Sequence, residues 1–291
     1  MNNYEIFVDV SADLDMELVK ACGAHLISME YILNGETVEY TGENYDYKAF
    51  YDMIEHNMPT TSQISPAKYE EIFAPYLEKG ISVLYLGLSS GLSSTFQSSK
   101  IAAEDLKEKY HDAAVFSVDT RSVCSGLMAM LKMAYENKEK GMSAEENLKD
   151  IEARRFDFLG FAFVENLMHL VHGGRLNAVT GAVGTVLNLK PLIELTTEGK
   201  LEQCGLKRGT KKAAQAFIDM YKEKANFDSH YPVFIDHSEN LELAQYISDG
   251  IRAINPKAVV KNLIISPIIG VHLGQKSIVM FFEKKEGVVH A

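Results

Sequence analysis

Short apolar runs alternate with longer stretches of helical periodicity along most of the chain. The clearest unit is Ile81–Leu88, a continuous apolar run that predicts a buried strand, followed by the polar segment Ser89–Ser94 and a helix to about Tyr110. The same patterns in the first half predict strands at Tyr4–Val10 and Ala113–Val118, and helices at Asp15–Cys22, Tyr47–Asn57, Pro66–Lys79 and Leu127–Lys140. Because apolar strands joined by helices form parallel sheets covered on both faces, this half predicts a Rossmann-like parallel sheet.

Turn residues predict two hairpins. Asn34-Gly35 supplies the positive φ of a tight turn between His25–Leu33 and Glu36–Tyr40, and Glu198-Gly199 separates Pro191–Thr196 from Lys200–Gly205. Between the second and third helices, Met58–Ser65 is a polar loop by composition.

The second half predicts another α/β unit. Phe158–Val164 is expected to be a strand that closes the first sheet, and the Gly- and Ala-rich segment His172–Lys190 is expected to be helical. Helices are predicted at Lys211–Lys224 and Leu241–Ile254, with strands at Tyr231–Asp236, Ala258–Ile264 and Ser277–Phe282. The predicted fold is therefore α/β with two domains, an N-terminal domain at residues 1–160 and a C-terminal domain at residues 161–291.

Composition narrows the class of protein. The chain has 291 residues, is 46% hydrophobic and carries a formal net charge of -11, which argues against a nucleic-acid-binding protein because phosphate requires a basic surface. Its start lacks the basic and apolar regions of a signal peptide, and it contains no apolar run long enough for a transmembrane segment. Three scattered cysteines predict neither a disulfide framework nor a zinc site. These features predict a cytoplasmic protein.

The segment Ser89–Thr95 carries the most informative chemistry. It joins the carboxyl end of an apolar strand to the start of a helix, where ligands bind in open parallel sheets and where free N–H groups attract anions. Its hydroxyl groups add further donors. A helix cap alone would also explain Ser93 or Ser94, and the pattern does not decide between the two interpretations.

Two other sites must be weighed. Gly87–Gly91 matches the G-x-S-x-G nucleophile elbow and makes a serine hydrolase built on Ser89 an alternative, but the oxyanion-type residues His172-Gly173-Gly174 follow the serine in the chain instead of preceding it. His169 and His172 lie three residues apart without a matching carboxylate or cysteine, so we expect no metal site.

A basic cluster interrupts the acidic chain at a predicted connection between a strand and a helix. Its residues are Lys207, Arg208, Lys211 and Lys212. A solvated turn is the ordinary meaning of such a charge run, whereas the functional interpretation is a docking patch for phosphate or for an acidic partner.

Several motifs, in the same order along nearly the whole chain, resemble those of the DegV family of fatty-acid-binding proteins. Asp9–Leu14 (DVSADL) resembles the family's D-S-T-A-D-L, and Thr61–Ser65 (TSQIS) resembles T-S-Q-P-S. Leu88–Ser98 (LSSGLSSTFQS) resembles L-S-S-G-L-S-G-T-Y-Q-S, Gly173–Leu176 (GGRL) resembles G-G-R-I, and Lys190-Pro191 matches the family's K-P.

The resemblance implies that a long-chain fatty acid is buried in a tunnel at the domain interface. By the same resemblance, Thr61 and Ser93 hold its carboxylate, His272 lies near the head group, and Ser62 and Ser94 belong to the neighbouring loops. The family's motif G-x-H-x-G-P-G reads Gly-Val-His-Leu-Gly-Gln-Lys here, so Gln275 and Lys276 replace its proline and glycine.

The resemblance also implies a role. Relatives of this kind serve as non-catalytic subunits of fatty acid kinase in phospholipid metabolism, in which a separate ATP-binding subunit phosphorylates the carboxylate. Arg175, Lys207 and Arg208 are then candidates for docking that subunit or the phosphate. No cofactor is implied beyond the bound fatty acid. Transient contact with a membrane is compatible with such a carrier, and a scaffold with a structural lipid is a further alternative to the hydrolase.

Overall fold

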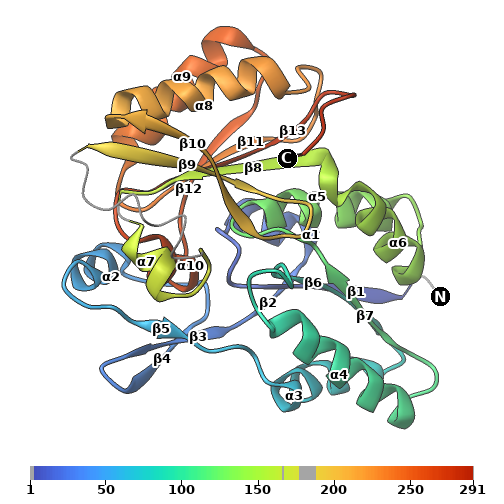
Figure 1. The fold of residues 1–291 in the computed structure, drawn as a ribbon. Helices are drawn as coiled ribbons and strands as arrows, with labels where there is room; N and C mark the ends of the chain where they lie inside the picture. Colours follow the sequence, from blue (N-terminus) through green and yellow to red (C-terminus); the bar gives the residue numbers. More distant parts are fainter. Residues whose placement is uncertain (1–2, 166, 177–187, 291) are drawn as a thin grey trace.

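The first sheet is fully parallel. The computed structural model describes residues 3–165, 167–176 and 188–290. The strands follow the order β2-β1-β6-β7 (Figure 1), with bounds β1 (Tyr4–Asp9), β2 (His25–Ile27), β6 (Ser82–Gly87) and β7 (Val115–Asp119). All six residues of β6 are buried, as its apolar run predicted. The predicted α/β fold with a parallel sheet is therefore confirmed.

Helices cover both faces of this sheet. One face packs on α3 (Pro66–Leu77) and α4 (Thr95–Lys109), and the other on α5 (Gly126–Glu139) and α6 (Ala144–Arg154), while α1 (Met16–Cys22) lies against α5. Helix α6 was missed in the sequence, although Ser143 and Glu146 form a capping box at its start. A short 3-10 helix, Arg155–Asp157, follows it.

The second sheet has six strands in the order β10-β9-β8-β13-β11-β12. Their bounds are β8 (Phe158–Phe163), β9 (Leu189–Leu195), β10 (Leu201–Arg208), β11 (Val233–His237), β12 (Val260–Ile264) and β13 (Ile278–Glu283). Strand β8 pairs with β9 and β13, so the expectation that this segment closes the first sheet is wrong. An apolar run marks a buried strand without indicating which sheet buries it. The division at residue 160 stays a prediction.

Alternate residues along strand β8 face opposite sides of the second sheet. Leu159 and Phe163 lie under α8 (Thr210–Lys224) and α9 (Leu241–Ile254), in a core of their own. Phe158 and Ala162, at alternate positions on the same strand, belong to the larger core that also contains the first sheet. The inner face of the second sheet and the first sheet therefore share one interior.

A small third sheet lies beside this interior. It has the order β4-β3-β5, with β3 (Met29–Leu33), β4 (Glu36–Tyr40) and β5 (Thr60–Thr61). Helix α2 (Tyr47–Ile54) and helix α10 (Pro267–Leu273) pack in this region, and α7 (Met168–His172) contacts α10 (Figure 1).

Three predictions fail in these regions. The single strand expected at His25–Leu33 is divided, because β2 pairs with β1 whereas β3 belongs to the third sheet. Thr60 and Thr61 form a strand against β3 and are not part of a loop. The helix expected at His172–Lys190 is wrong at both ends, where α7 ends at His172 and β9 begins at Leu189; residues 177–187 lie outside the described ones.

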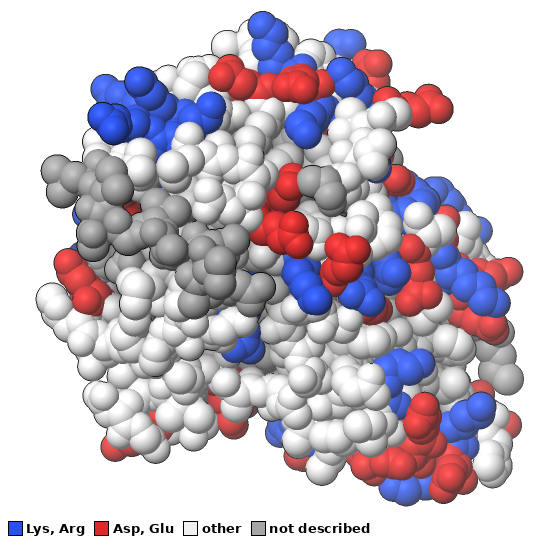
Figure 2. All heavy atoms as spheres, viewed as in Figure 1, with Lys and Arg blue, Asp and Glu red and all other residues white. Residues whose placement is uncertain are grey.

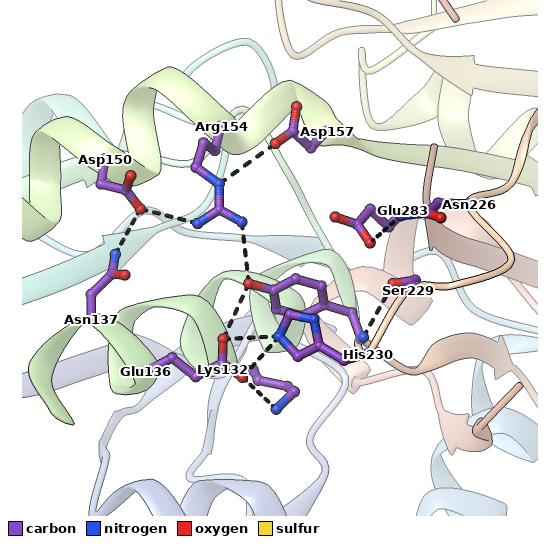
Figure 3. A network of polar contacts seen from close by, with 11 residues as sticks. Lys132, Glu136, Asn137, Asp150, Arg154, Asp157, Asn226, Ser229, His230 and Glu283 are labelled. Atoms are coloured by element: carbon purple, nitrogen blue, oxygen red, sulfur yellow. Dashed lines mark hydrogen bonds and ion pairs between the residues drawn. The ribbon is translucent and has the colours of Figure 1, made fainter. Parts of the chain in front are cut away.

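A polar network joins α5 and α6 to the segment before β11 (Figure 3). Glu136 accepts hydrogen bonds from Lys132 at 2.6 Å and from His230 at 3.1 Å, and Arg154 bonds Asp150 at 3.2 Å. The Tyr231 hydroxyl lies between Glu136 and Arg154, so the network crosses from the helices of the first sheet to the second sheet.

Candidate functional site

A largely apolar cavity of about 240 Å³ lies in the interior shared by the two large sheets. Strands β8, β9 and β13, helix α10 and the loop after β6 all contribute to its wall. The apolar lining residues include Met29, Leu88, Leu92, Val123, Phe161, Ala162, Leu170, Ile193, Leu195, Leu201, Ile268, Ile269, Leu273, Val279 and Phe281. The polar lining residues include Thr61, Ser62, Gln63, Ser93, Ser94, Arg175, Glu194 and His272.

The loop after β6 is held by buried hydrogen bonds. Asp9, at the end of β1, accepts from the backbone N–H of Leu88 at 3.1 Å, and Asp119, at the end of β7, accepts from the Ser90 hydroxyl at 2.7 Å. At Gly91 a Cβ would lie 2.5 Å from the carbonyl oxygen of Glu198, so the turn between β9 and β10 packs directly on this loop. The neighbouring strands thereby fix the loop that carries Ser93.

Ser93 lines the cavity with a hydroxyl that is already engaged. Its Oγ accepts from the Thr95 N–H at 3.2 Å and donates to the Thr95 Oγ1 at 2.9 Å. Ser94 occupies the cap position of α4 but makes no side-chain cap bond. Both interpretations of the loop are therefore compatible with Ser93, which satisfies the helix start and also faces the cavity.

Thr61 and His272 meet at the cavity wall. The Thr61 Oγ1 lies 2.9 Å from the His272 Nε2, although the two residues are 211 positions apart in the chain. Strand β5 places Thr61 beside Tyr31 of β3, and α10 carries His272. Pro267 at the first turn of α10 begins the helix that includes His272.

Burial keeps the His272 imidazole neutral. Its pKa is lowered from 6.5 to about 3, first by desolvation and then by the positive charges of Arg175, His169 and His172. The ring packs against Gly173, where a Cβ would lie 2.3 Å from the His272 Nδ1. Among the described residues this Nδ1 has no hydrogen-bond partner.

Arg175 brings a cation to the same wall. Its Nε donates to the Leu92 carbonyl at 3.1 Å, and its Nη1 donates to the Gly173 carbonyl. Burial lowers the pKa of its guanidinium. No carboxylate is an ion-pair partner of Arg175 among the described residues, and the cavity thus holds a partly buried positive charge near His272.

The basic cluster lies outside the cavity. Lys207 and Arg208 are exposed at the end of β10, and Lys211 and Lys212 are exposed at the start of α8. Figure 2 shows Lys and Arg side chains gathered over this part of the surface. The fold therefore separates the three predicted docking residues, because only Arg175 lines the cavity.

Gln275 and Lys276, which stand where the family has proline and glycine, each compensate locally for that replacement. The Gln275 side chain donates to the Tyr51 carbonyl at 2.5 Å, which ties the end of α10 to α2. Lys276 adopts a φ of 58°, the left-handed conformation that glycine adopts most easily. The sequence did not reveal these contacts, because they depend on α2 lying beside α10.

The contacts of Ser89 are those of a residue that holds the fold together. Its side chain is fully buried, and its hydroxyl donates to the Gly199 carbonyl at 2.7 Å. It is not among the residues that line the cavity. Its hydroxyl thus joins the loop after β6 to the turn between β9 and β10, and no described contact gives it the general base that a hydrolase nucleophile requires.

The helices that the structure describes are too short or too polar to span a membrane.

Comparisons with known proteins agree with this architecture. The family described as uncharacterised protein, DegV family, matches residues 3–285. A DegV domain-containing protein of Clostridium perfringens is 33% identical over 290 residues, covering 97% of this chain and 98% of its own.

Solved structures give the same result. A Thermotoga maritima protein whose structure reveals fatty acid binding function has a TM-score of 0.84 at 25% identity, covering 97% of this chain and 99% of its own. A fatty-acid-binding DegV family protein of Thermus thermophilus has a TM-score of 0.83 at 25% identity, covering 97% of this chain and 100% of its own. The chain belongs to the DegV family.

Proposed function

We propose that this protein binds a long-chain fatty acid in the cavity, with the carboxylate held by Thr61 and Ser93 and flanked by His272. The observation that carries the proposal is that Thr61 and His272 lie 2.9 Å apart and line one apolar cavity together with Ser93, although the three residues come from distant segments. The fatty-acid-binding relatives from Thermotoga maritima and Thermus thermophilus support the ligand class.

The cavity lining combines a large apolar wall with a few polar side chains, which suits an amphiphilic ligand. Burial of a methylene group stabilises a complex by about 0.8 kcal/mol, so the apolar wall supplies most of the affinity for a long chain. A buried carboxylate must be hydrogen-bonded, because an unpaired buried charge costs several kcal/mol. Hydroxyl donors and the nearby Arg175 guanidinium meet this requirement without a direct salt bridge.

Neutral His272 leaves the Thr61 hydroxyl available to the ligand. When Nε2 carries the imidazole proton it donates to the Thr61 Oγ1, and the Thr61 hydroxyl hydrogen is then free to donate to a carboxylate. Ser93 becomes a donor to the ligand when its hydroxyl hydrogen turns away from the Thr95 Oγ1. Both changes are hydroxyl rotations that need no movement of the backbone.

We further propose that the bound carboxylate is presented to a separate ATP-binding kinase subunit. That subunit would transfer the γ-phosphoryl group of ATP to a carboxylate oxygen, giving an acyl phosphate and ADP. Arg175 would face the transferred phosphate from the cavity wall, and the exposed Lys207 and Arg208 would dock the acidic surface of the partner.

Ligand binding is tested by native mass spectrometry of the purified protein and by titration of the delipidated protein with palmitate and oleate. Thr61→Val and Ser93→Ala should each weaken binding by about 1–3 kcal/mol, the cost of an unsatisfied buried group. Thr60→Val, the exposed neighbour on β5, serves as the matched control and should bind as wild type does. Wild-type affinity in both test variants would place the carboxylate elsewhere, and no uptake of any fatty acid would refute the carrier role.

Presentation is tested with a purified ATP-binding subunit of a fatty acid kinase. Acyl phosphate is trapped as the hydroxamate with hydroxylamine, in the presence and absence of this protein. Lys207→Glu with Arg208→Glu should slow hydroxamate formation while leaving fatty acid affinity unchanged. Tight fatty acid binding without hydroxamate formation would contradict the kinase role alone.

A further inference from the structure

Two buried carboxyl groups meet where the two large sheets face each other. Asp13, which follows β1, and Asp236, on β11, are both completely buried. Asp13 Oδ1 accepts from the backbone N–H of Ser266 at 2.7 Å, whereas Asp236 Oδ2 accepts from the N–H of Ser125 at 3.2 Å and from its hydroxyl at 2.5 Å. Each carboxyl group therefore accepts from a segment of the other half of the molecule.

The second oxygen of each carboxyl group indicates that the two groups share a proton. Asp13 Oδ2 and Asp236 Oδ1 are buried and have no hydrogen-bond partner among the described residues. One carboxylate oxygen of each group and the Cys124 Sγ all lie within 4.8 Å of one another, and the buried Ser266 hydroxyl is likewise without a partner among the described residues. One proton between the carboxyl groups satisfies both free oxygens.

The electrostatics agree with this geometry. Desolvation raises the pKa of Asp13 to about 7, and it raises the pKa of Asp236 well above its ordinary value, with a further contribution from the charge of Asp13. Two carboxylates this close cannot both be charged in an apolar interior. The pair thus keeps a proton at neutral and acidic pH.

The groups that face the pair do not neutralise it. Burial raises the pKa of the Cys124 thiol and of the phenols of Tyr40, Tyr47 and Tyr51, so these groups are uncharged near neutral pH. Lys261 pairs with Asp15 at 2.5 Å.

The pair is linked to the cavity on two sides. Cys124 lines the cavity directly. Ser266, which donates to Asp13, begins α10, and that helix contributes Ile268, Ile269 and His272 to the cavity wall. Movement at the pair would therefore be transmitted to the wall around the ligand.

We propose that Asp13 and Asp236 share one proton as a latch between the two halves of the molecule, and that loss of this proton releases α10 and speeds exchange of the bound acyl chain. The second part rests on the proposed fatty acid binding, whereas the first part does not. Once the proton is lost, repulsion between the two carboxylates separates Asp13 from Asp236 and weakens the bond between Asp13 and Ser266.

A divalent cation such as Zn²⁺ is the competing occupant of Asp13, Cys124 and Asp236. Metal binding requires these ligands to be deprotonated. The raised pKa values of all three groups instead favour the protonated forms. The observations thus favour the proton, and the metal becomes an outcome of the test.

The first test measures thermal stability of the ligand-free protein between pH 5 and pH 9. A carboxyl group with a raised pKa contributes stability that is fully present below its ordinary pKa and is lost as the pH rises through the raised value, which is about 7 for Asp13. The wild-type melting temperature should fall by several degrees across neutrality. Asp13→Asn and Asp236→Asn should flatten the curve, because an amide donates permanently to the remaining carboxylate. Asp15→Asn, the neighbouring buried acid, should keep the wild-type pH profile.

The second test measures transfer of a fluorescent fatty acid from the protein to phosphatidylcholine vesicles at the same pH values. The wild-type release rate should rise several-fold between pH 6 and pH 9, and the rates of the two Asn variants should change much less. Ionisation of the fatty acid itself changes the release rates of wild type and variants alike, so its effect cancels in the ratio of the two rates.

The outcomes separate the hypotheses. Wild-type pH profiles in both foldable Asn variants would overturn the latch. A stability increase on addition of Zn²⁺ to the dialysed protein that is lost in both variants would assign the site to a metal instead. A confirmed stability profile with no fatty acid bound at any pH would retain the latch and refute the proposed function.

Discussion

Helix α10 has a buried titratable group at each end, and the two ends respond to pH in opposite directions. Its start at Ser266 is bonded to Asp13 of the protonated acid pair, and its end carries the neutral His272 beside Thr61. Desolvation is the largest cause of the pKa shift at both ends. Burial favours the uncharged form in each case, which is the protonated carboxyl group at one end and the deprotonated imidazole at the other.

The consequence for stability follows from the sign of each shift. The contribution of His272 is fully present above about pH 6.5 and is lost as the pH falls toward 3. The contribution of Asp13 is fully present below its ordinary pKa and is lost as the pH rises through about 7. The stability contributed at the two ends of the helix thus changes with pH in opposite directions.

The largest effect is expected at the acid pair. Asp236→Ala removes the acceptor of both Ser125 donors and leaves Asp13 without its partner, so it should lower the free energy of unfolding by about 3–5 kcal/mol. Urea denaturation at pH 6 measures the change. The isosteric Asp236→Asn is the control and should cost much less; equal losses in the two variants would show that the shared hydrogen bonds are unimportant.

A second effect is expected at the other end of α10, at His272, under acidic conditions. His272→Gln removes a group that must remain unprotonated in the fold, so it should make the protein less sensitive to acid. The pKa change from 6.5 to about 3 corresponds to about 3 kcal/mol at pH 4. Urea denaturation at pH 7 and pH 4 gives the difference. An unchanged acid sensitivity would mean that His272 is accessible to protons in the folded state.

A smaller effect is expected where Gln275 ties α10 to α2. Gln275→Ala removes the donor to the Tyr51 carbonyl and should destabilise the protein by about 1 kcal/mol at any pH. The exposed Gln245, which bonds Asp249 within α9, is a matched control, and Gln245→Ala should have less effect. A pH-dependent loss in Gln275→Ala would indicate coupling to the titrating ends of the helix.

The smallest effect is expected at Lys276. Lys276→Gly relieves the left-handed conformation of a non-glycine residue and should change the free energy of unfolding by less than about 1 kcal/mol, in the stabilising direction. Thermal denaturation compared with wild type measures it. A clear destabilisation would mean that the Lys276 side chain makes a contact that outweighs the backbone strain.

Local patterns predicted the elements better than their partners. The apolar run before the serine loop became β6, and the amphipathic segment Leu241–Ile254 became α9 with those bounds. The segment at β8 was predicted as a strand but was assigned to the wrong sheet, since alternation and apolar runs report burial and not the identity of the neighbouring strand. The segment His25–Leu33 likewise contained enough information for strands and too little to divide them between two sheets.

The candidate site was predicted in the same uneven way. The loop containing Ser93 had a local signal, because hydroxyl residues followed an apolar strand and preceded a helix. Thr61 and His272 entered through resemblance to the DegV family, and their 2.9 Å contact depends on β5 and α10 being brought together. Asp13 lies within the Asp9–Leu14 motif, but no local pattern indicated that it would lie together with Cys124 and Asp236 in the interior.

The sequence by itself determined the α/β class, most of the strands and helices, and the serine-rich loop, because these depend on periodicity and on turn residues within a few positions. The tertiary structure alone decided which side chains share the cavity and which acids share the interior. Desolvation and the proximity of charged groups arise only when distant segments pack together, and they set the neutral state of His272 and the raised pKa of Asp13.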